Sequence, residues 1–259
     1  MVIAQVAFLL GIRKKVTLEN IKKAYPELSL TRQKEIAKKA YSNLGTVFSE
    51  MLYLRFAYFK KIGKHISASN PVLFQDSLKE NRGLIVVAGH FANWEWLALG
   101  GALILKKNFA IVRKNIQTSF TERFLEKMRV RTGNTLINAG DIRGMYRWLQ
   151  NRGCIALLAD QSAPGESTRV EFFGQNVPTF EGPARLALRT RATLLFAECL
   201  RKENGDYLIT FYSVPYDDLF GDSSENIHEL TSRHTRILEE SIRRHPDQWL
   251  WQHRRWKNA

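Results

Sequence analysis

An unbroken apolar run at residues 83–88, followed at once by Gly89 and His90, most constrains how this chain can fold. A run without polar alternation is typical of a strand that is buried on both faces, as in a parallel or mixed sheet covered by helices. Residues 94–106 then continue with apolar positions at helical spacing. His90 is therefore predicted at the carboxyl end of a central strand, where open α/β sheets bind their ligands.

Glu95 follows His90 by five residues, and this spacing limits how the two side chains can meet. Residues five apart on a regular helix point about 140° away from each other. The pair can meet only if His90 precedes the first turn, on a strand-to-helix bend that Gly89 permits. Glu95 could then accept a hydrogen bond from one imidazole nitrogen and leave the other as a general base. Spacing alone favours the alternative, a loop histidine and an unrelated surface glutamate.

Strands and helices alternate along the chain, which predicts an α/β fold: a mostly parallel central sheet with helices on both faces and a helical N-terminal layer. No internal repeat or linker interrupts the pattern, so we expect one domain over 1–259, with the helical layer at 1–70 and the α/β catalytic core at 71–259. A polar loop with an apolar island is predicted at 162–179. Further strands are predicted at 109–112, 135–137, 154–159, 192–200 and 207–212, and helices at 17–26, 71–80, 118–131, 142–150, from 182 onward, and 226–244.

A long helix is predicted from Ser29, which is a good N-cap residue, to about Phe59. Its second half, from Val47, is apolar nearly all round. Such a helix is buried either in protein or in lipid, and we expect the protein core. The alternative is a basic and aromatic membrane patch that includes Lys60 and Lys61.

The first residues suggest a membrane anchor that is too short to span a bilayer. Residues 2–10 are apolar but fall short of the about 20 residues that a spanning helix needs. Together with the basic cluster at 13–15 they could insert into an anionic interface, or they could form a short packed helix.

The charge balance favours an anionic partner. The formal net charge is +14, which suits nucleic acid, an anionic membrane or an acidic carrier protein. Aromatic residues make up 11% of the chain, which inclines the choice toward lipid. Cys154 and Cys199 lie in apolar runs and are expected to be buried thiols in a reducing compartment, with no metal site.

Polar residues directly follow three predicted strands: His90, Arg113 and Asp160. Because the carboxyl ends of parallel strands meet at one edge of a sheet, we expect a shared cleft there.

A series of short motifs runs along the chain around His90. In order they are Asn20 with 24–27, the segment 89–95, 112–113, Arg131 with Gly133, 160–161, 172–174, Thr179 with 182–184, and 251–257. This series resembles that of the bacterial lipid A biosynthesis acyltransferases, the lauroyl- and myristoyl-transferase group of the lysophospholipid acyltransferase superfamily. The segment 89–95 is similar to the family's H-x4-D/E active-site motif. The wider superfamily's third motif often reads Glu-Gly-Thr-Arg, whereas this chain has Pro183 after Glu181 and Gly182, so no phosphate-binding role is carried over to Glu181.

The resemblance implies transfer of a fatty acyl chain from a thioester to a lipid hydroxyl, without a cofactor. The expected donor is acyl carrier protein, with acyl-coenzyme A as the alternative. His90 would take the proton of the attacking hydroxyl, and Glu95 would orient His90 and stabilise the imidazolium. The reaction would be direct, without an acyl-enzyme.

Five residues are predicted to bind substrate: Arg113, Arg131, Asn93, Asp160 and Gln161. The two arginines could hold a phosphate or sugar phosphate by bidentate contacts, or could merely form surface salt bridges. Arg113 is also a candidate donor to the oxyanion. Asp160 and Gln161 are expected to shape the cleft. The acyl pocket is expected between the sheet and the N-terminal helices, lined by residues such as Trp94, Trp96 and Phe48.

The expected location is the cytoplasmic face of the bacterial inner membrane, peripheral or weakly anchored. The tail at 249–257 interleaves Trp with Arg and Lys, so it could meet the membrane interface or pack on the core. Three other functions remain open: a coenzyme A-dependent acyltransferase acting on another glycolipid or a glycerophospholipid, a thioester hydrolase, and a non-catalytic membrane or nucleic-acid binding protein. The absence of a nucleic-acid-binding motif argues against nucleic acid.

Overall fold

The computed structural model describes residues 12–113, 120–163 and 167–257. The apolar segment at 2–10 lies outside them, so the predictions about a membrane anchor are not tested.

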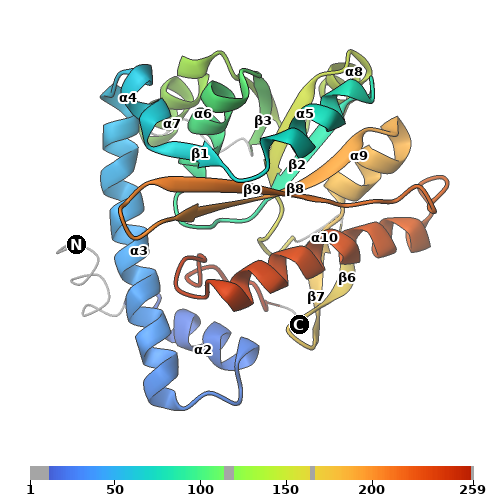
Figure 1. The fold of residues 1–259 in the computed structure, drawn as a ribbon. Coiled ribbons are helices and arrows are strands. Elements are labelled where there is room, and N and C mark those ends of the chain that lie inside the picture. Colours follow the sequence, from blue (N-terminus) through green and yellow to red (C-terminus); the bar gives the residue numbers. More distant parts are fainter. Residues whose placement is uncertain (1–11, 114–119, 164–166, 258–259) are drawn as a thin grey trace.

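A seven-stranded sheet forms the centre of the described fold (Figure 1). Its strand order is β1-β9-β8-β2-β5-β3-β4. Neighbouring strands run parallel except β8 and β9, which form an antiparallel pair. The predicted α/β class with a mostly parallel sheet is confirmed. The strands are β1 Ile66–Ala68, β2 Leu84–Ala88, β3 Phe109–Arg113, β4 Thr135–Asn138, β5 Cys154–Leu158, β8 Thr193–Arg201 and β9 Tyr207–Ser213.

Strand β2 is the central strand that its apolar run predicts, and all five of its residues are buried. Ile85 and Val87 point into one core cluster, whereas Leu84, Val86 and Ala88 point into a second cluster on the opposite face. Each fully buried Val, Leu or Ile contributes about 1.5–3 kcal/mol relative to exposure. Two-sided burial therefore fixes β2, and with it the position of the residues that follow.

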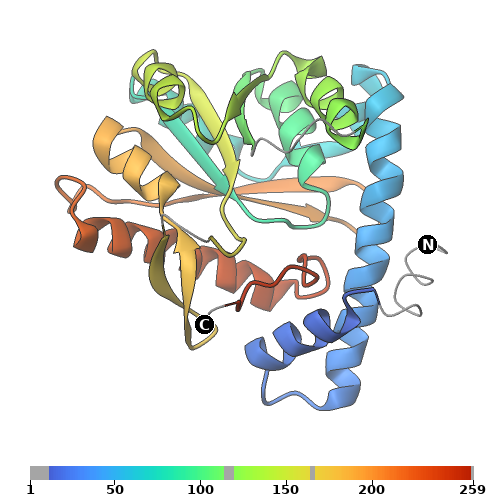
Figure 2. The ribbon, with the colours of Figure 1, turned by 180° about the vertical axis from the view of Figure 1, so that it is seen from behind.

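Helices cover both faces of the sheet, as Figures 1 and 2 show from opposite sides. Helices α5, α6 and α7 contribute to the core cluster on one face, and α8, α9 and α10 contribute to the cluster on the other. The helices are α2 Lys14–Ala24, α3 Leu30–Phe56, α4 Phe59–Lys64, α5 Pro71–Lys79, α6 Trp94–Leu105, α7 Phe120–Arg129, α8 Ile142–Gln150, α9 Gly182–Thr190 and α10 Ser224–Arg244. Within the described ranges, none of them is long and apolar enough to cross a bilayer.

Helix α3 runs along one side of the molecule, from α2 to α4 (Figure 1). The Ser29 hydroxyl accepts a hydrogen bond from the backbone N–H of Arg32, which confirms the predicted N-cap. The prediction that its second half is buried is wrong for Phe48, Leu52 and Phe56, which are exposed. An all-round apolar sequence does not itself say which face the protein covers.

The predicted loop at 162–179 contains an antiparallel hairpin, β6 Ser167–Phe172 and β7 Gln175–Phe180. Phe173 and Gly174 form its two-residue turn, both with positive φ, as such hairpin turns require. Strand β1 was also missed, because three residues carry little periodicity. It belongs to the sheet although it lies inside the predicted helical layer, and the single-domain prediction remains untested.

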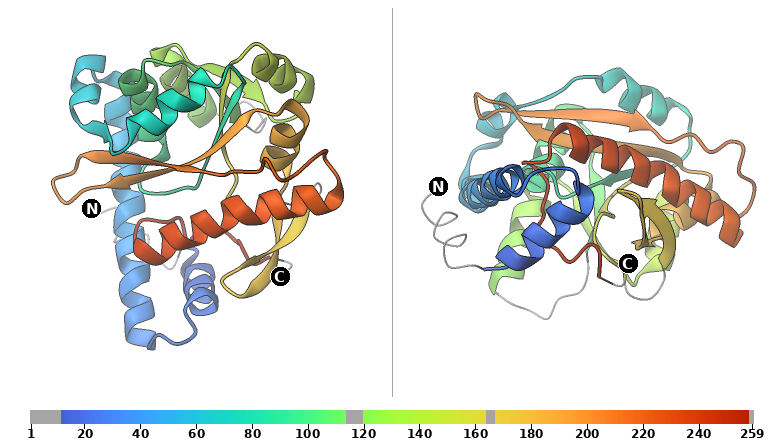
Figure 3. Two further views of the ribbon diagram at one scale, coloured as in Figure 1. Left: turned by 45° about the vertical axis from the view of Figure 1, so that its right-hand side comes forward. Right: turned by 90° about the horizontal axis from the view of Figure 1, so that it is seen from below.

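The C-terminal segment packs into the core rather than onto the surface. Trp249, Trp251 and Trp256 are buried, and Figure 3 shows α2, α10 and the β6–β7 hairpin around this segment. Of the two possibilities for this tail, core packing is confirmed. The two cysteines, Cys154 and Cys199, are buried free thiols, as predicted.

Candidate active site

His90 lies on the bend between β2 and α6, at the carboxyl edge of the sheet. Its partner is Asp160, which follows the neighbouring strand β5. Ala88 of β2 lies opposite Leu158 of β5. His90 and Asp160 each follow by two residues, so the two side chains leave the sheet at the same level. The Nδ1 atom of His90 lies 2.6 Å from Oδ1 of Asp160, and the His90 backbone N–H donates to Oδ2 over 2.7 Å.

Asp160 is buried and accepts a third hydrogen bond, from the indole N–H of Trp249 over 2.8 Å. Burial alone would raise the pKa of Asp160, but the charge of His90 and the hydrogen bonds from His90 and Trp249 outweigh it and lower the pKa to about 2. The carboxylate is therefore ionised at neutral pH and accepts a hydrogen bond from Nδ1–H of His90. The Nε2 atom of His90 is left as the base, 3.4 Å from Nε2 of Gln161.

Glu95 does not form the predicted hydrogen bond with His90. Both residues are described, and no hydrogen bond or ion pair joins them. Glu95 is buried at the second position of α6, where it accepts hydrogen bonds from Nε of Arg129 over 2.9 Å and from Nη2 of the same guanidinium. Burial lowers the pKa of Arg129, but the hydrogen bond and charge of Glu95, together with the charges of Glu122 and Glu126, raise it overall. The turn of the helix aims Glu95 at α7 instead of at the bend.

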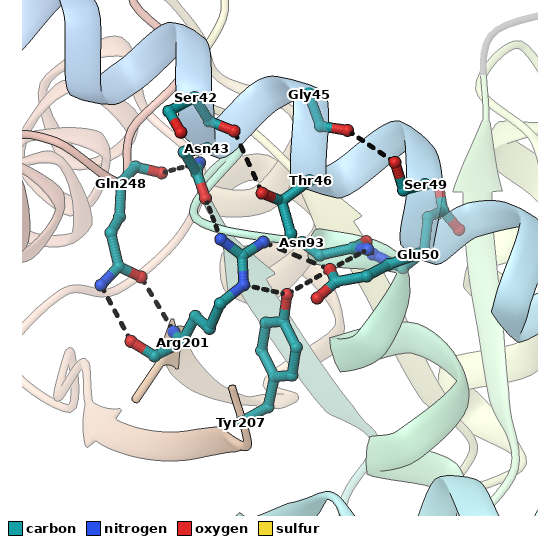
Figure 4. Close-up of polar contacts among 11 residues, drawn as sticks. Ser42, Asn43, Gly45, Thr46, Ser49, Glu50, Asn93, Arg201, Tyr207 and Gln248 are labelled. Carbon is teal, nitrogen blue, oxygen red and sulfur yellow. Dashed lines mark hydrogen bonds and ion pairs between the residues drawn. The ribbon is translucent and has the colours of Figure 1, made fainter. Parts of the chain in front are cut away.

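Asn93 is fully buried and does not line the pocket, so the structure does not support its predicted role in binding substrate. It is the N-cap of α6: its Oδ1 accepts from the backbone N–H of Glu95, and its Nδ2 donates to Oε2 of Glu50 over 3.0 Å. The same oxygen accepts hydrogen bonds from Arg201 and from Tyr207 (Figure 4). This network joins α3 and the sheet to the start of α6.

Arg131 has a structural position rather than one in the site. Its guanidinium donates to the carbonyl oxygens of Leu54 and, over 2.7 Å, of Ala57. These carbonyls belong to the end of α3, which lacks helical partners for them. Arg131 is not among the described residues that line the pocket, so its predicted role in binding substrate is not supported.

Arg113 and Gln161 do line the pocket, and their roles in binding substrate remain predictions. Arg113 forms ion pairs with Glu126 over 2.8 Å and with Glu122 over 3.7 Å, so its guanidinium is held toward α7. Asp160, by contrast, sits behind His90 and not in the cleft wall, where it was predicted.

A mostly apolar pocket of about 490 Å³ opens beside His90. Its lining comes from both faces of the sheet: Val86 and Ala88 from the face that α6 covers, Leu157 and Ala159 from the other. On the side of α6, β3 and α7 the lining residues are Leu97, Ala98, Gly101, Leu105, Phe109 and Leu125. On the side of α8 and α9 they are Ala139, Met145, Tyr146, Gly182, Arg185 and Leu186.

Only one of the three predicted pocket residues is in the pocket. Trp94 lines it, with its ring centroid 4.7 Å from that of His90. Trp96 is buried on the neighbouring side of α6, where it stacks on Tyr207. Phe48 is exposed on α3.

Sequence reasoning missed the contribution of residues 248–251, here termed the C-terminal strap. Trp249 forms an antiparallel bridge with Phe91, and the Leu250 N–H donates to the carbonyl of His90 over 3.2 Å. The Gln248 carbonyl accepts from the N–H of Ala92 over 2.7 Å. Ala92 has a φ of 38°, which is uncommon for a residue with a side chain, so the strap holds a strained bend.

The arrangement can perform base catalysis on a substrate hydroxyl. An ionised, buried carboxylate fixes one imidazole nitrogen, and the other lies beside an apolar pocket, where it accepts a long hydrogen bond of 3.4 Å from the Gln161 amide. Within the described ranges, no three His, Cys, Asp or Glu side chains gather closely enough to hold a metal ion.

Comparisons with known proteins point to the same chemistry. Residues 2–258 match the family described as bacterial lipid A biosynthesis acyltransferase. The chain is similar to a lipid A biosynthesis palmitoleoyltransferase of Escherichia coli, with 23% identity over 248 residues that cover 95% of this chain and 79% of the relative. A lipid A biosynthesis acyltransferase of Shigella flexneri shows the same identity and coverage. A lipid A biosynthesis lauroyltransferase of Escherichia coli is 22% identical over 253 residues, again covering 95% of this chain and 79% of the relative. The protein is thus an acyltransferase that belongs to the bacterial lipid A biosynthesis acyltransferase family.

Proposed function

We propose that this enzyme transfers a fatty acyl chain from an acyl thioester to a hydroxyl group of a lipid A-type glycolipid, with His90 as the general base and Asp160 as the residue that orients it. The contact between Nδ1 of His90 and the buried carboxylate of Asp160, at the edge of an apolar pocket, carries this proposal. Asp160 thereby takes the role that the sequence assigned to Glu95. The relatives' names, which specify palmitoleoyl and lauroyl transfer in lipid A biosynthesis, support the substrate class.

The reaction needs one proton relay and no covalent enzyme intermediate. Nε2 of His90 takes the proton of the acceptor hydroxyl while its oxygen attacks the thioester carbonyl. We assign stabilisation of the tetrahedral oxyanion to Arg113, which lines the pocket, because the N–H groups of His90 and Ala92 on the bend already donate to Asp160 and Gln248. When the C–S bond breaks, the imidazolium returns its proton to the leaving thiolate, giving an ester and a free thiol. The Asp160 carboxylate stabilises the imidazolium throughout.

The two sides of the pocket differ in the residues that line them. The side lined from α6, β3 and α7 by Leu97, Leu105 and Leu125 is apolar, and we assign it to the acyl chain. Arg113, Gln161 and Arg185 also line the pocket, and we assign their polar groups to the thioester or the sugar. The net charge of +14 favours an acidic carrier protein as donor, with acyl-coenzyme A as the alternative. The acceptor places the enzyme at the cytoplasmic face of the inner membrane, held there peripherally.

The test is acyl transfer from radiolabelled acyl carrier protein, and separately from acyl-coenzyme A, to a purified lipid A precursor and to a glycerophospholipid. We expect labelling of the lipid A precursor by the wild type, and loss of at least about 10³-fold of the rate in His90→Ala. His228→Ala, which removes an exposed histidine on α10, is the matched control and should keep full activity.

Each result has a distinct meaning. Faster transfer from acyl-coenzyme A would identify acyl-coenzyme A as the donor. Labelling of the glycerophospholipid alone would identify that lipid, and not the lipid A precursor, as the acceptor. Release of free fatty acid without transfer would make the enzyme a hydrolase. Full activity in His90→Ala would refute the mechanism.

A further inference from the structure

The second half of α3 and the adjoining α4 present aromatic side chains to the outside. Phe48, Leu52 and Phe56 follow one another at intervals of four residues, and are 61%, 59% and 71% exposed. Tyr58, at the junction with α4, is 78% exposed, and Phe59 begins α4. Large apolar residues grouped in this way mark an interaction site more often than they do a plain surface.

The charged residues of the segment 51–75 are all positive. Residues 51–75 contain one arginine and three lysines, and neither aspartate nor glutamate. Lys60, Lys61 and Lys64 are all exposed. We call this surface the α3–α4 face: Phe48, Leu52, Phe56, Tyr58 and Phe59 with Lys60, Lys61 and Lys64.

The exposed helix is firmly held by its opposite side. Val47 and Leu54 are buried, and Glu50 lies in the hydrogen-bonded network with Asn93 and Arg201 (Figure 4). The last carbonyls of α3 are bound by the Arg131 guanidinium. The backbone of the α3–α4 face is therefore held in place by the rest of the fold before any partner arrives.

The face also lies one helix away from the pocket. Phe56 contacts Phe124 of α7, with ring centroids 6.5 Å apart. Leu125 and Arg129 on the same helix line the pocket. Whatever covers the α3–α4 face is thus brought close to the wall of the candidate active site.

We propose that the α3–α4 face docks on an anionic lipid bilayer, with its aromatic rings among the headgroups and its lysines on the lipid phosphates. Aromatic residues flanked by lysines are the combination that binds such interfaces. A symmetric contact between two copies would bring the lysines of both together, and their repulsion argues against a dimer. The inference rests on the proposed lipid acceptor, because docking here places the pocket beside the membrane that holds it.

The test is sedimentation of the full chain with vesicles of phosphatidylcholine alone and of phosphatidylcholine with phosphatidylglycerol. In Lys60→Gln with Lys61→Gln we expect binding to anionic vesicles to fall about 25-fold at low salt, since each lysine contributes about fivefold. The matched control is Lys38→Gln with Lys39→Gln, which removes the same charge from the other half of α3 and should bind nearly as well as the wild type.

The aromatic side chains are tested separately. In Phe48→Ser with Phe56→Ser we expect binding to both vesicle types to fall at least about tenfold. Phe220→Ser removes an equally exposed ring from the β9–α10 loop, on the far side of the molecule from α3, and should bind like the wild type (Figure 1).

Unchanged vesicle binding in both double variants would overturn the proposal. Unchanged binding together with a lower melting temperature or altered self-association would overturn it too, because the face would then be covered by residues 1–11 or by a second copy. In both double variants, the rate of acyl transfer to a detergent-dispersed acceptor should stay within about twofold of the wild-type rate. Vesicle binding is measured without turnover, so the two measurements together separate a failed docking surface from a failed acyl transfer.

Discussion

Replacing Asp160 with asparagine tests the catalytic pair with the smallest possible change of shape. Asp160 acts only as an acceptor. Its three donors are the backbone N–H of His90, Nδ1–H of His90 and the indole N–H of Trp249. If the oxygen of the introduced amide takes the two donors on the Oδ2 side, its NH₂ group faces Nδ1 of His90. The imidazole must then carry its proton on Nε2, where it can no longer accept one from the hydroxyl.

The size of the effect follows from the geometry. The carboxylate and the imidazolium that forms in the transition state have charge centres about 4 Å apart, which at an effective dielectric of about 20 corresponds to about 4 kcal/mol. Loss of that stabilisation lowers kcat about 10³-fold. Since Asp160 does not line the pocket, KM should change little. The assay is steady-state transfer from the preferred thioester, with circular dichroism to confirm the fold.

Glu95→Gln provides the opposing variant. It removes the charge that pairs with Arg129, and breaking a buried pair in this way costs about 3 kcal/mol of stability or more. The kcat of the folded enzyme should stay within about tenfold of wild type, because Glu95 does not contact His90. The reasoning is refuted if Asp160→Asn keeps more than a tenth of kcat while folded Glu95→Gln loses about 10³-fold.

Three further outcomes follow from the same structure. Trp249→Phe keeps the ring but loses the N–H that binds Asp160. Because a hydrogen bond to a charged group is worth about 1.5–3 kcal/mol, we expect kcat to fall about tenfold with KM unchanged. Unchanged kcat with lower stability would contradict this prediction. Burial lowers the pKa of His234 to about 4, and the unfolded value is about 6.5. The unfolded state therefore binds the proton first, and stability present above about pH 6.5 should fall by about 3 kcal/mol as the pH drops to about 4. Urea unfolding should show that His234→Gln lacks this part of the slope. Gly101 lines the side of the pocket that we assign to the acyl chain, and a Cβ there meets Ile209 at an ordinary 3.6 Å. Competition between a long and a short acyl donor should show Gly101→Leu favouring the short one by about tenfold.

The sequence predicted the position of His90 but not its partner. Residues 84–88 are apolar without alternation, which is sufficient to identify a central strand and the bend after it. Asp160 was likewise placed after a strand. That the two strands are neighbours in register depends on strand order, which local patterns do not encode. Glu95 was chosen because it is near in sequence, whereas its partner Arg129 comes from another helix.

Patterns of apolar residues also failed where burial depends on neighbours. The second half of α3 has apolar residues on every side, so its composition could not separate buried Leu54 from exposed Phe56. The hairpin at 167–180 was hidden by its polar outward positions, although Gly174 marks its turn. Arg131 was predicted to bind substrate because its segment resembles a family motif, and such a resemblance does not distinguish a helix cap from a substrate ligand.

The bend that carries His90 can reach its final conformation only late in synthesis, because the C-terminal strap holds it. His90 and Ala92 leave the ribosome long before Gln248 and Leu250, whose backbone groups hold them. Contacts between such distant parts of a chain form slowly, because a long loop must close first. A nascent chain can assemble β2 and α6 and still lack an oriented general base. The proposed general base is therefore oriented only after residues 248–251 have been made and have folded back onto the bend.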